Sequence, residues 1–311
     1  MNHFANLVGQ EKVKSTLSFY LEAYNKTNNI PFLNFVGATG LGKTCFVREF
    51  ASNIVDANGN RKPLIEINSS SIKSSKQFFE HIFLPHVSDQ EVIVFFDEAH
   101  ALPRDLSFAL LTICNTEKDH IREYNAGDNN YIFDFSKHHF IFATSESDKL
   151  FIPLRNRFIT IEFADYNHED LKKIFMSNLP SVEFDDDALE ILAETSRGNA
   201  RSCVARAQQV RTYVATYGIS KFTLEHAKSL FKILGVLPYG LNRVECQILN
   251  ILKNEGQCSL TSLAAKTGLT RSALQRDFEL FLLKKGFISI EGLRGITLKG
   301  CKALDKVSSF S

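Results

Sequence analysis

Residues 37–44 read Gly37-Ala38-Thr39-Gly40-Leu41-Gly42-Lys43-Thr44, and this stretch decides the fold. It matches the pattern G-x-x-x-x-G-K-[ST], whose glycines let backbone N–H groups converge on an anion. An apolar run of strand length precedes it at 31–36, and a helical stretch follows it. This pattern binds phosphate when it lies between a strand and a helix, whose positive end adds to the attraction. The alternative, a glycine-rich turn before an unrelated lysine, explains none of this context.

Two side chains of this loop have expected roles in binding a nucleotide. Lys43 is expected to reach the β and γ phosphates, and Thr44 to hold Mg²⁺ through its hydroxyl. The expected cofactors are therefore ATP and Mg²⁺, held by residues 37–44 with Cys45 directly behind them.

A second motif occupies residues 91–100, which read EVIVFFDEAH. An apolar run that ends in two carboxylates predicts a central parallel strand whose carboxyl end enters a site. Asp97 is expected to hold the Mg²⁺ shell, and Glu98 to polarise the attacking water as a general base. The alternative, an acidic cap on the next helix, needs only one carboxylate.

Composition places the chain among ordinary globular proteins. The 311 residues suggest two or three domains, and 44% are hydrophobic and 23% charged. The 27 phenylalanines and the absence of tryptophan predict a phenylalanine-rich core. The six cysteines show neither C-x-x-C nor metal-ligand spacing, so we expect reduced thiols. No apolar run has the length of a membrane helix and no signal peptide is visible, so we expect a cytoplasmic protein without membrane contact.

Residues 1–165 alternate between predicted strands and helices, which indicates an α/β domain with a parallel sheet covered on both faces. The predicted strands are 32–36, 64–68, 92–96, 140–143 and 158–163, and the predicted helices are 11–25, 43–55, 75–84 and 103–114. An insertion at 119–135 has two alternating runs around a turn-rich centre, which predicts a β-hairpin. A long surface loop is the alternative.

The remainder divides into two further predicted domains. Residues 166–236 read as all-helical, with helices expected at 188–193 and 200–216. Residues 237–311 show a helix at 243–253, a short helix at 259–268, a longer helix at 271–285 and two short strands at 287–290 and 295–298. This order predicts a winged helix-turn-helix. A helical domain used only for protein contacts is the alternative.

Charge supports nucleic acid as the partner of this last domain. From Pro238 onward the chain holds eleven Lys and Arg against six Asp and Glu, a charge of about +5. We expect phosphate contacts that are salt-sensitive and largely independent of sequence. The candidate DNA-binding residues are Arg271, Arg276, Lys284, Lys285 and Arg294.

Taken in order, these motifs resemble the AAA+ ATPases, and among them the RuvB family of Holliday-junction branch-migration motors. The likeness spans nearly the whole chain. It rests on the opening at 4–11, the phosphate loop, the strand at 95–100, the strand at 140–144, the segment at 153–158 and the motif at 196–201. It implies an AAA+ P-loop domain, a helical lid and a C-terminal winged helix.

The resemblance also assigns roles to single residues. Leu7 and Val8 would lie against the adenine, and Thr144 would be the sensor-1 threonine. Arg155 and Arg157 would form the arginine-finger segment, and Arg201 would be the sensor-2 arginine of the lid. Tyr166 either stacks on the adenine or belongs to the core.

Arg157 follows far along the chain from the phosphate loop, so we expect it to reach the γ-phosphate of a neighbouring copy. That arrangement requires a homo-oligomer, and the resemblance implies a hexameric ring.

The sequence also departs from the family pattern. Ala38 and Thr39 stand where the family has two prolines, which leaves phosphate binding intact. The wing keeps one arginine, Arg294, beside Glu291 where the family has an arginine cluster. In the family the hairpin docks the junction-binding partner RuvA through apolar residues, whereas the centre of the 119–135 hairpin is polar here.

Three functions remain open on sequence alone. The first is an ATP-driven DNA translocase that acts on branched DNA as a ring. The second is an ATP-dependent loader or initiator, similar to clamp loaders or origin-recognition ATPases, in which ATP switches assembly on DNA and hydrolysis is slow. The third is an adaptor that uses its winged helix for protein contacts. The hairpin and the wing favour the first.

Overall fold

The computed structural model describes residues 3–56, 58–114, 121–126 and 129–310. The chain divides into two compact units, Met1–Tyr166 and Asn167–Ser311. The second unit contains both the predicted lid and the predicted winged helix, so the three-domain division stays a prediction. Within the described ranges, every helix is too short or too polar to cross a lipid bilayer.

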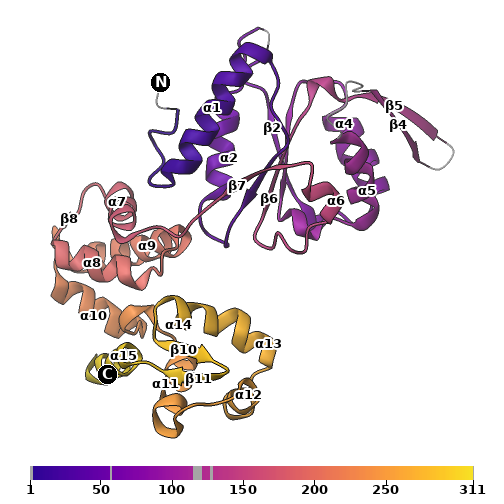
Figure 1. Ribbon diagram of the computed structural model, residues 1–311. Helices are drawn as coiled ribbons and strands as arrows, with labels where there is room; N and C mark the ends of the chain where they lie inside the picture. The colour runs from indigo at the N-terminus through magenta and orange to yellow at the C-terminus, as the bar shows by residue number, and fades with distance from the viewer. Residues whose placement is uncertain (1–2, 57, 115–120, 127–128, 311) are drawn as a thin grey trace. The chain divides into compact units, whose positions relative to one another are not determined.

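The first unit is built on a five-stranded parallel sheet in the order β2-β3-β6-β1-β7 (Figure 1). The strands are β1 (Leu33–Val36), β2 (Leu64–Asn68), β3 (Ile93–Asp97), β6 (His139–Thr144) and β7 (Ile159–Glu162). Each of the five predicted strands is present with bounds shifted by at most a residue, and the predicted α/β fold class is confirmed. All carboxyl ends of a parallel sheet meet at one edge, which brings the ends of β1, β3 and β6 together.

Helices lie on both faces of this sheet, with α1 and α2 on one side and α4 and α5 on the other in Figure 1. The α-helices of the unit are α1 (Glu11–Thr27), α2 (Lys43–Ser52), α3 (Ser75–Phe78), α4 (Leu84–His86), α5 (Arg104–Ile113) and α6 (Ile152–Arg155). The predicted helix at 75–84 is divided by a π-helical turn, η2 (Phe79–Phe83), ahead of Pro85. The described part of the first unit also contains the 3₁₀ turns η1 (Ser69–Ser71), η3 (Ala99–Ala101) and η4 (Phe135–Lys137).

The core is rich in phenylalanine, as the composition predicts. Among the described residues, the largest side chains that are fully buried are all phenylalanines. Phe96, at the centre of the sheet, stacks on Phe142 at 5.2 Å between ring centroids, and Phe142 stacks on Phe158 at 4.2 Å. These ring contacts join β3 to β6 and join β6 to the residue that directly precedes β7.

The predicted hairpin is present as β4 (Ile121–Ala126) and β5 (Asn129–Asp134), which pair antiparallel. Residues 119, 120, 127 and 128 of the predicted insertion lie outside the described residues. Ile121 and Ile132 are exposed by 56% and 72%, so the hairpin presents apolar side chains despite its polar centre.

The second unit begins with four helices, α7 (His168–Asn178), α8 (Asp186–Thr195), α9 (Ala200–Tyr217) and α10 (Leu224–Leu234). The expectation of an all-helical segment is wrong in one detail, because β8 (Glu183–Phe184) and β9 (Lys221–Phe222) form a short parallel pair. Two residues are too few to show strand periodicity in a sequence. The rings of Phe184 in β8 and Phe222 in β9 contact each other, with their centroids 5.7 Å apart.

The remainder of the second unit is a winged helix, which the sequence predicts. A 3₁₀ turn, η5 (Pro238–Gly240), precedes α11 (Arg243–Glu255), α12 (Leu260–Thr267), α13 (Arg271–Ala273), the π-helical η6 (Leu274–Glu279) and α14 (Leu280–Lys284). The wing consists of β10 (Ile288–Glu291) and β11 (Leu293–Ile296), paired antiparallel. A final helix, α15 (Leu298–Phe310), was not expected, and it packs against α11.

Candidate active site

The phosphate loop connects β1 to α2, and a side chain would not fit at two of its glycines. A Cβ on Gly37 would lie 2.8 Å from the Cβ of Phe163, which is closer than two non-bonded carbon atoms can approach. Gly42 has φ +92, a conformation that favours glycine. The two invariant glycines of the pattern, Gly37 and Gly42, are therefore required by the backbone they occupy.

Tyr166 contacts the phosphate loop. Its hydroxyl donates to the carbonyl oxygen of Leu41 at 3.1 Å, and its side chain is buried. A Cβ on Gly42 would lie 3.2 Å from this hydroxyl oxygen. The structure therefore places Tyr166 against the phosphate loop, and its stacking on adenine stays a prediction.

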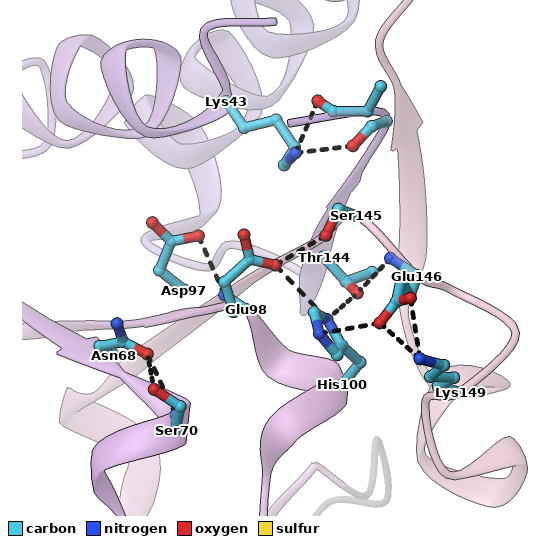
Figure 2. Close-up of polar contacts among 12 residues, drawn as sticks. Lys43, Asn68, Ser70, Asp97, Glu98, His100, Thr144, Ser145, Glu146 and Lys149 are labelled. Carbon is cyan, nitrogen blue, oxygen red and sulfur yellow. Dashed lines mark hydrogen bonds and ion pairs between the residues drawn. The ribbon is translucent and has the colours of Figure 1, made fainter. Parts of the chain in front are cut away.

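Lys43 and Thr44 lie where the loop enters α2. The Lys43 ammonium donates to the carbonyl oxygens of Gly37 and Ala38, at 2.6 and 3.1 Å (Figure 2). Thr44 Oγ1 donates to Asp97 Oδ2 at 3.1 Å, across 53 residues of sequence. The two predicted Mg²⁺ ligands are therefore neighbours. Asp97 lies at the carboxyl end of β3, and Thr44 lies in the first turn of α2.

This pair of oxygens fits Mg²⁺. The ion prefers hard oxygen ligands and is usually bound by one or two protein groups, with phosphates and water completing its shell. A hydroxyl and a carboxylate oxygen 3.1 Å apart can both reach one ion without rearrangement of the backbone.

Glu98 follows β3 in a left-handed conformation, with φ +51, which is unusual for a residue with a side chain. Its Oε2 accepts a hydrogen bond from Ser145 Oγ at 2.9 Å and lies 3.4 Å from His100 Nδ1 (Figure 2). The carboxylate is partly exposed, so it can accept a proton from water. Backbone strain of this kind concentrates at functional sites.

Thr144 ends β6, the strand next to β3. Its Oγ1 lies 2.9 Å from His100 Nδ1 and accepts a hydrogen bond from the backbone N–H of Glu146 at 3.0 Å. His100, Ser145 and Glu146 are not among the site residues predicted from the sequence. A signal was present, because each follows a predicted strand within four residues and neighbouring strands place such residues at one edge.

The predicted arginine-finger segment forms α6 and the turn after it. Arg155 Nη1 donates to the carbonyl oxygen of Ser147 at 3.2 Å, and Arg157 Nη1 donates to that of Pro153 at 2.9 Å. Both side chains are half-buried, and both guanidinium groups bond to backbone carbonyls. Their action on a neighbouring nucleotide stays a prediction.

The N-terminal segment is anchored close to α2. Phe4 is buried and stacks on Phe46 of α2 at 6.1 Å between centroids, and the backbone N–H of Leu7 donates to the Phe4 carbonyl. Leu7 and Val8 are half-buried, and Cys45 is exposed. This packing holds the predicted adenine-side residues near the helix that carries Thr44.

The remaining predicted site residues belong to the second unit. Arg201 is exposed in the first turn of α9. The side chain of Asn199 caps this helix by accepting a hydrogen bond from the backbone N–H of Ser202. Arg271, Arg276 and Lys284 are exposed on the helices of the winged domain. Lys285 is partly buried, and burial lowers the pKa of its ammonium group.

Arg294 differs from the other DNA-binding candidates. Its guanidinium donates to both carboxylate oxygens of Glu279, at 2.8 and 3.3 Å, and both side chains are nearly buried. The charge of Arg294 is therefore neutralised within the fold, which makes it the weakest of the five candidates for contacting phosphate.

Comparison with known proteins agrees with this architecture. Residues 33–166 match the model of the ATPase family associated with various cellular activities (AAA), and residues 238–305 match the RuvB C-terminal winged helix domain. The Holliday junction branch migration complex subunit RuvB of Kosmotoga olearia is 29% identical over 293 residues, covering 90% of this chain and 82% of that protein. The RuvB of Thermotoga maritima is 27% identical over 290 residues, covering 91% of this chain and 84% of the relative.

Solved structures show the same similarity. The Thermotoga maritima RuvB Holliday junction branch migration motor superimposes with a TM-score of 0.75 at 25% identity, covering 96% of this chain and 95% of its own. A point mutant of that protein reaches a TM-score of 0.78 at 25% identity, with 98% of both chains covered. The chain therefore combines an AAA ATPase domain, with the phosphate loop and the Thr44–Asp97 pair in place, and a RuvB-type winged helix domain, and it is similar to RuvB over about nine-tenths of its length.

Proposed function

We propose that this protein is an ATP-driven DNA translocase that moves the duplex arms of branched DNA, as a Holliday-junction branch-migration motor. The observation that carries the proposal is the contact between Thr44 and Asp97, with Glu98 directly beside it, in a chain that ends in a RuvB-type winged helix. The relatives named Holliday junction branch migration complex subunit RuvB, which align over about nine-tenths of this chain, support the DNA substrate.

The cofactors are ATP and Mg²⁺. Thr44 and Asp97 would hold the ion, which when bound neutralises charge on the phosphate oxygens. Lys43 leaves its loop carbonyls to bind the β and γ phosphates. Glu98 accepts a proton from the attacking water, and Thr144 orients that water or the γ-phosphate by hydrogen bonding.

Hydrolysis is completed between neighbouring copies of the chain. Arg157 provides the finger that stabilises transition-state charge on the neighbour's γ-phosphate, with Arg155 beside it and Arg201 acting as the sensor of the lid. A site made of residues from two copies requires a homo-oligomer. In a closed hexameric ring every nucleotide site has a neighbouring copy that supplies its Arg157.

The winged helix contacts the DNA through phosphates. Arg271, Arg276, Lys284 and Lys285 supply the charge, and such contacts suit a motor that moves along any sequence. A RuvA-like protein docks on the exposed isoleucines of the β4–β5 hairpin, Ile121 and Ile132. Because its substrate is DNA, the protein acts in the cytoplasm.

The test uses a synthetic four-way junction with one labelled arm. We expect junction DNA to stimulate ATP hydrolysis, and the purified protein, with a RuvA-like partner where one is needed, to release the labelled strands. Glu98→Gln serves as the control, because it keeps the size of the side chain and removes the base. Hydrolysis without strand release, under conditions in which DNA is bound, would favour a loader over a motor.

A further inference from the structure

We infer that His100 is a positioning residue for ATP hydrolysis, which couples the sensor-1 hydroxyl of Thr144 to the carboxylate of Glu98. The inference rests on the proposed ATPase function and extends it to the last residue of the 91–100 motif, to which the sequence assigns no role. His100 lies in η3, the 3₁₀ turn directly after Glu98, and its side chain is 18% exposed.

One ring nitrogen of His100 faces both groups (Figure 2). Nδ1 is 2.9 Å from Thr144 Oγ1 and 3.4 Å from Glu98 Oε2. A shift of either group therefore displaces the same imidazole. Thr144 ends β6 and Glu98 follows β3, so the two groups come from different segments of the chain. The imidazole contacts both side chains directly, whereas Ser145, the neighbour of Thr144, contacts Glu98 alone of the two.

The other ring nitrogen is held by an acid. His100 Nε2 lies 3.2 Å from Glu146 Oε2, and Lys149 donates to both carboxylate oxygens of Glu146, at 2.8 and 2.9 Å. Glu146 at Nε2 is nearer than Glu98 at Nδ1, 3.2 Å against 3.4 Å, so we assign the proton to Nε2 and the Nδ1 lone pair to accept from Thr144. Glu146 thus orients the ring in the way a carboxylate orients a histidine in other active sites.

That tautomer determines the direction of the Thr144 hydroxyl. The oxygen of Thr144 already accepts from the backbone N–H of Glu146 at 3.0 Å, so its proton is free to point at Nδ1 of His100. When Thr144 turns to a γ-phosphate, this hydrogen bond breaks. The imidazole is then released to move relative to Glu98, which is otherwise held by Ser145.

His100 also borders a cavity of about 270 Å³ that opens beside the site. The cavity is lined by Ala99, His100, Leu102, Arg104, Ser107, Lys149 and Phe151. The ring therefore has open space beside it, which a coupling role requires and tight core packing would not allow.

The test compares substitutions that keep one side of the ring. Asparagine places its amide near the position of Nδ1, whereas glutamine extends to the position of Nε2. We would measure nucleotide affinity with a fluorescent ATP analogue, kcat with junction DNA, and the thermal midpoint. The variants are His100→Ala, His100→Asn, His100→Gln and Glu146→Gln. The control is His168→Ala, which removes a histidine that pairs with Glu190 in the second unit.

We expect His100→Ala to lower kcat by about 10²-fold with nucleotide affinity unchanged, since misplacement of a catalytic group costs about this much. His100→Asn should retain more activity than His100→Gln, and Glu146→Gln should lower kcat while His168→Ala does not. Wild-type kcat in His100→Ala, or equal losses in the Asn and Gln variants with a lowered midpoint, would overturn the coupling role alone. An inactive wild-type protein would reject the proposed function and this inference together.

Discussion

The guanidinium of Arg197 lies against the carboxylate of Glu245, with Nη2 and Oε1 2.6 Å apart and Nη1 and Oε2 3.4 Å apart. Glu245 is completely buried and also accepts from the backbone N–H of Asn242, so it caps α11 as well. Arg197 stacks on Phe281 at 3.2 Å from the ring centroid. This contact joins the predicted sensor-2 motif, residues 196–201, to α11, the first helix of the winged domain.

We expect Arg197→Ala to reduce the free energy of unfolding of the second unit by about 3–5 kcal/mol, because it leaves a buried carboxylate without its partner. Lysine should not restore the loss, since it can neither pair through two nitrogens nor stack on Phe281 as a planar group. Urea denaturation measures both. Lys266→Ala breaks an exposed pair with Glu255 and should cost about 0–1 kcal/mol. A similar small change in Arg197→Ala would contradict this account.

The second prediction concerns the phosphate loop. Lys43→Ala should lower nucleotide affinity by about 10²-fold or more, because each hydrogen bond to a charged group contributes about 1.5–3 kcal/mol. Anisotropy of a labelled ATP analogue measures it directly. Lys76→Ala provides the matched control, because it removes an exposed lysine of α3 that pairs with Glu80 of η2. Unchanged affinity in Lys43→Ala would discard the loop assignment.

Two arginines of the winged domain should behave differently on substitution. Arg271 is exposed, so Arg271→Ala should weaken DNA binding at every sequence and reduce the slope of log K against log salt by about 1. Arg294→Ala should leave that slope unchanged and instead destabilise the fold, because Glu279 loses its partner. Filter binding at several salt concentrations, with urea denaturation beside it, separates the two effects. A reduced slope in Arg294→Ala would return this residue to the DNA interface.

This difference shows which parts of the site a sequence can reveal. The phosphate loop and Asp97 are visible because their signals are local, a strand followed by characteristic polar residues. The Arg294–Glu279 pair is not, because the two residues meet only after the wing folds onto the helix. The role of His100 depends in the same way on the register of β3 and β6, which places it beside Thr144. Contacts that depend on strand register or domain packing need the structure.

The stability of the first unit should depend on pH through His139. Burial, and then the nearby Lys62 ammonium, lower the pKa of His139 to about 3 from the ordinary 6.5. Between these values the unfolded chain binds a proton that the folded chain does not, so stability falls as the pH decreases. From pH 6.5 to 5 the loss is about 2 kcal/mol, at about 1.4 kcal/mol per pH unit. His139→Gln should flatten this dependence in urea denaturation, and an unchanged slope would mean that other groups cause it.

The last prediction tests whether a nucleotide is shared between copies. Arg157→Ala should bind ATP normally and lose turnover by about 10³–10⁵-fold, because an arginine finger stabilises charge only in the transition state. Glu98→Gln should also be inactive, since it lacks the base. When the two variants are mixed, some sites combine Glu98 from one copy with Arg157 from its neighbour, and a fraction of the activity should return. Steady-state ATPase assays over a range of mixing ratios measure this recovery. If no ratio restores activity while the mixed proteins still assemble, Arg157 acts within its own copy or has no role in hydrolysis.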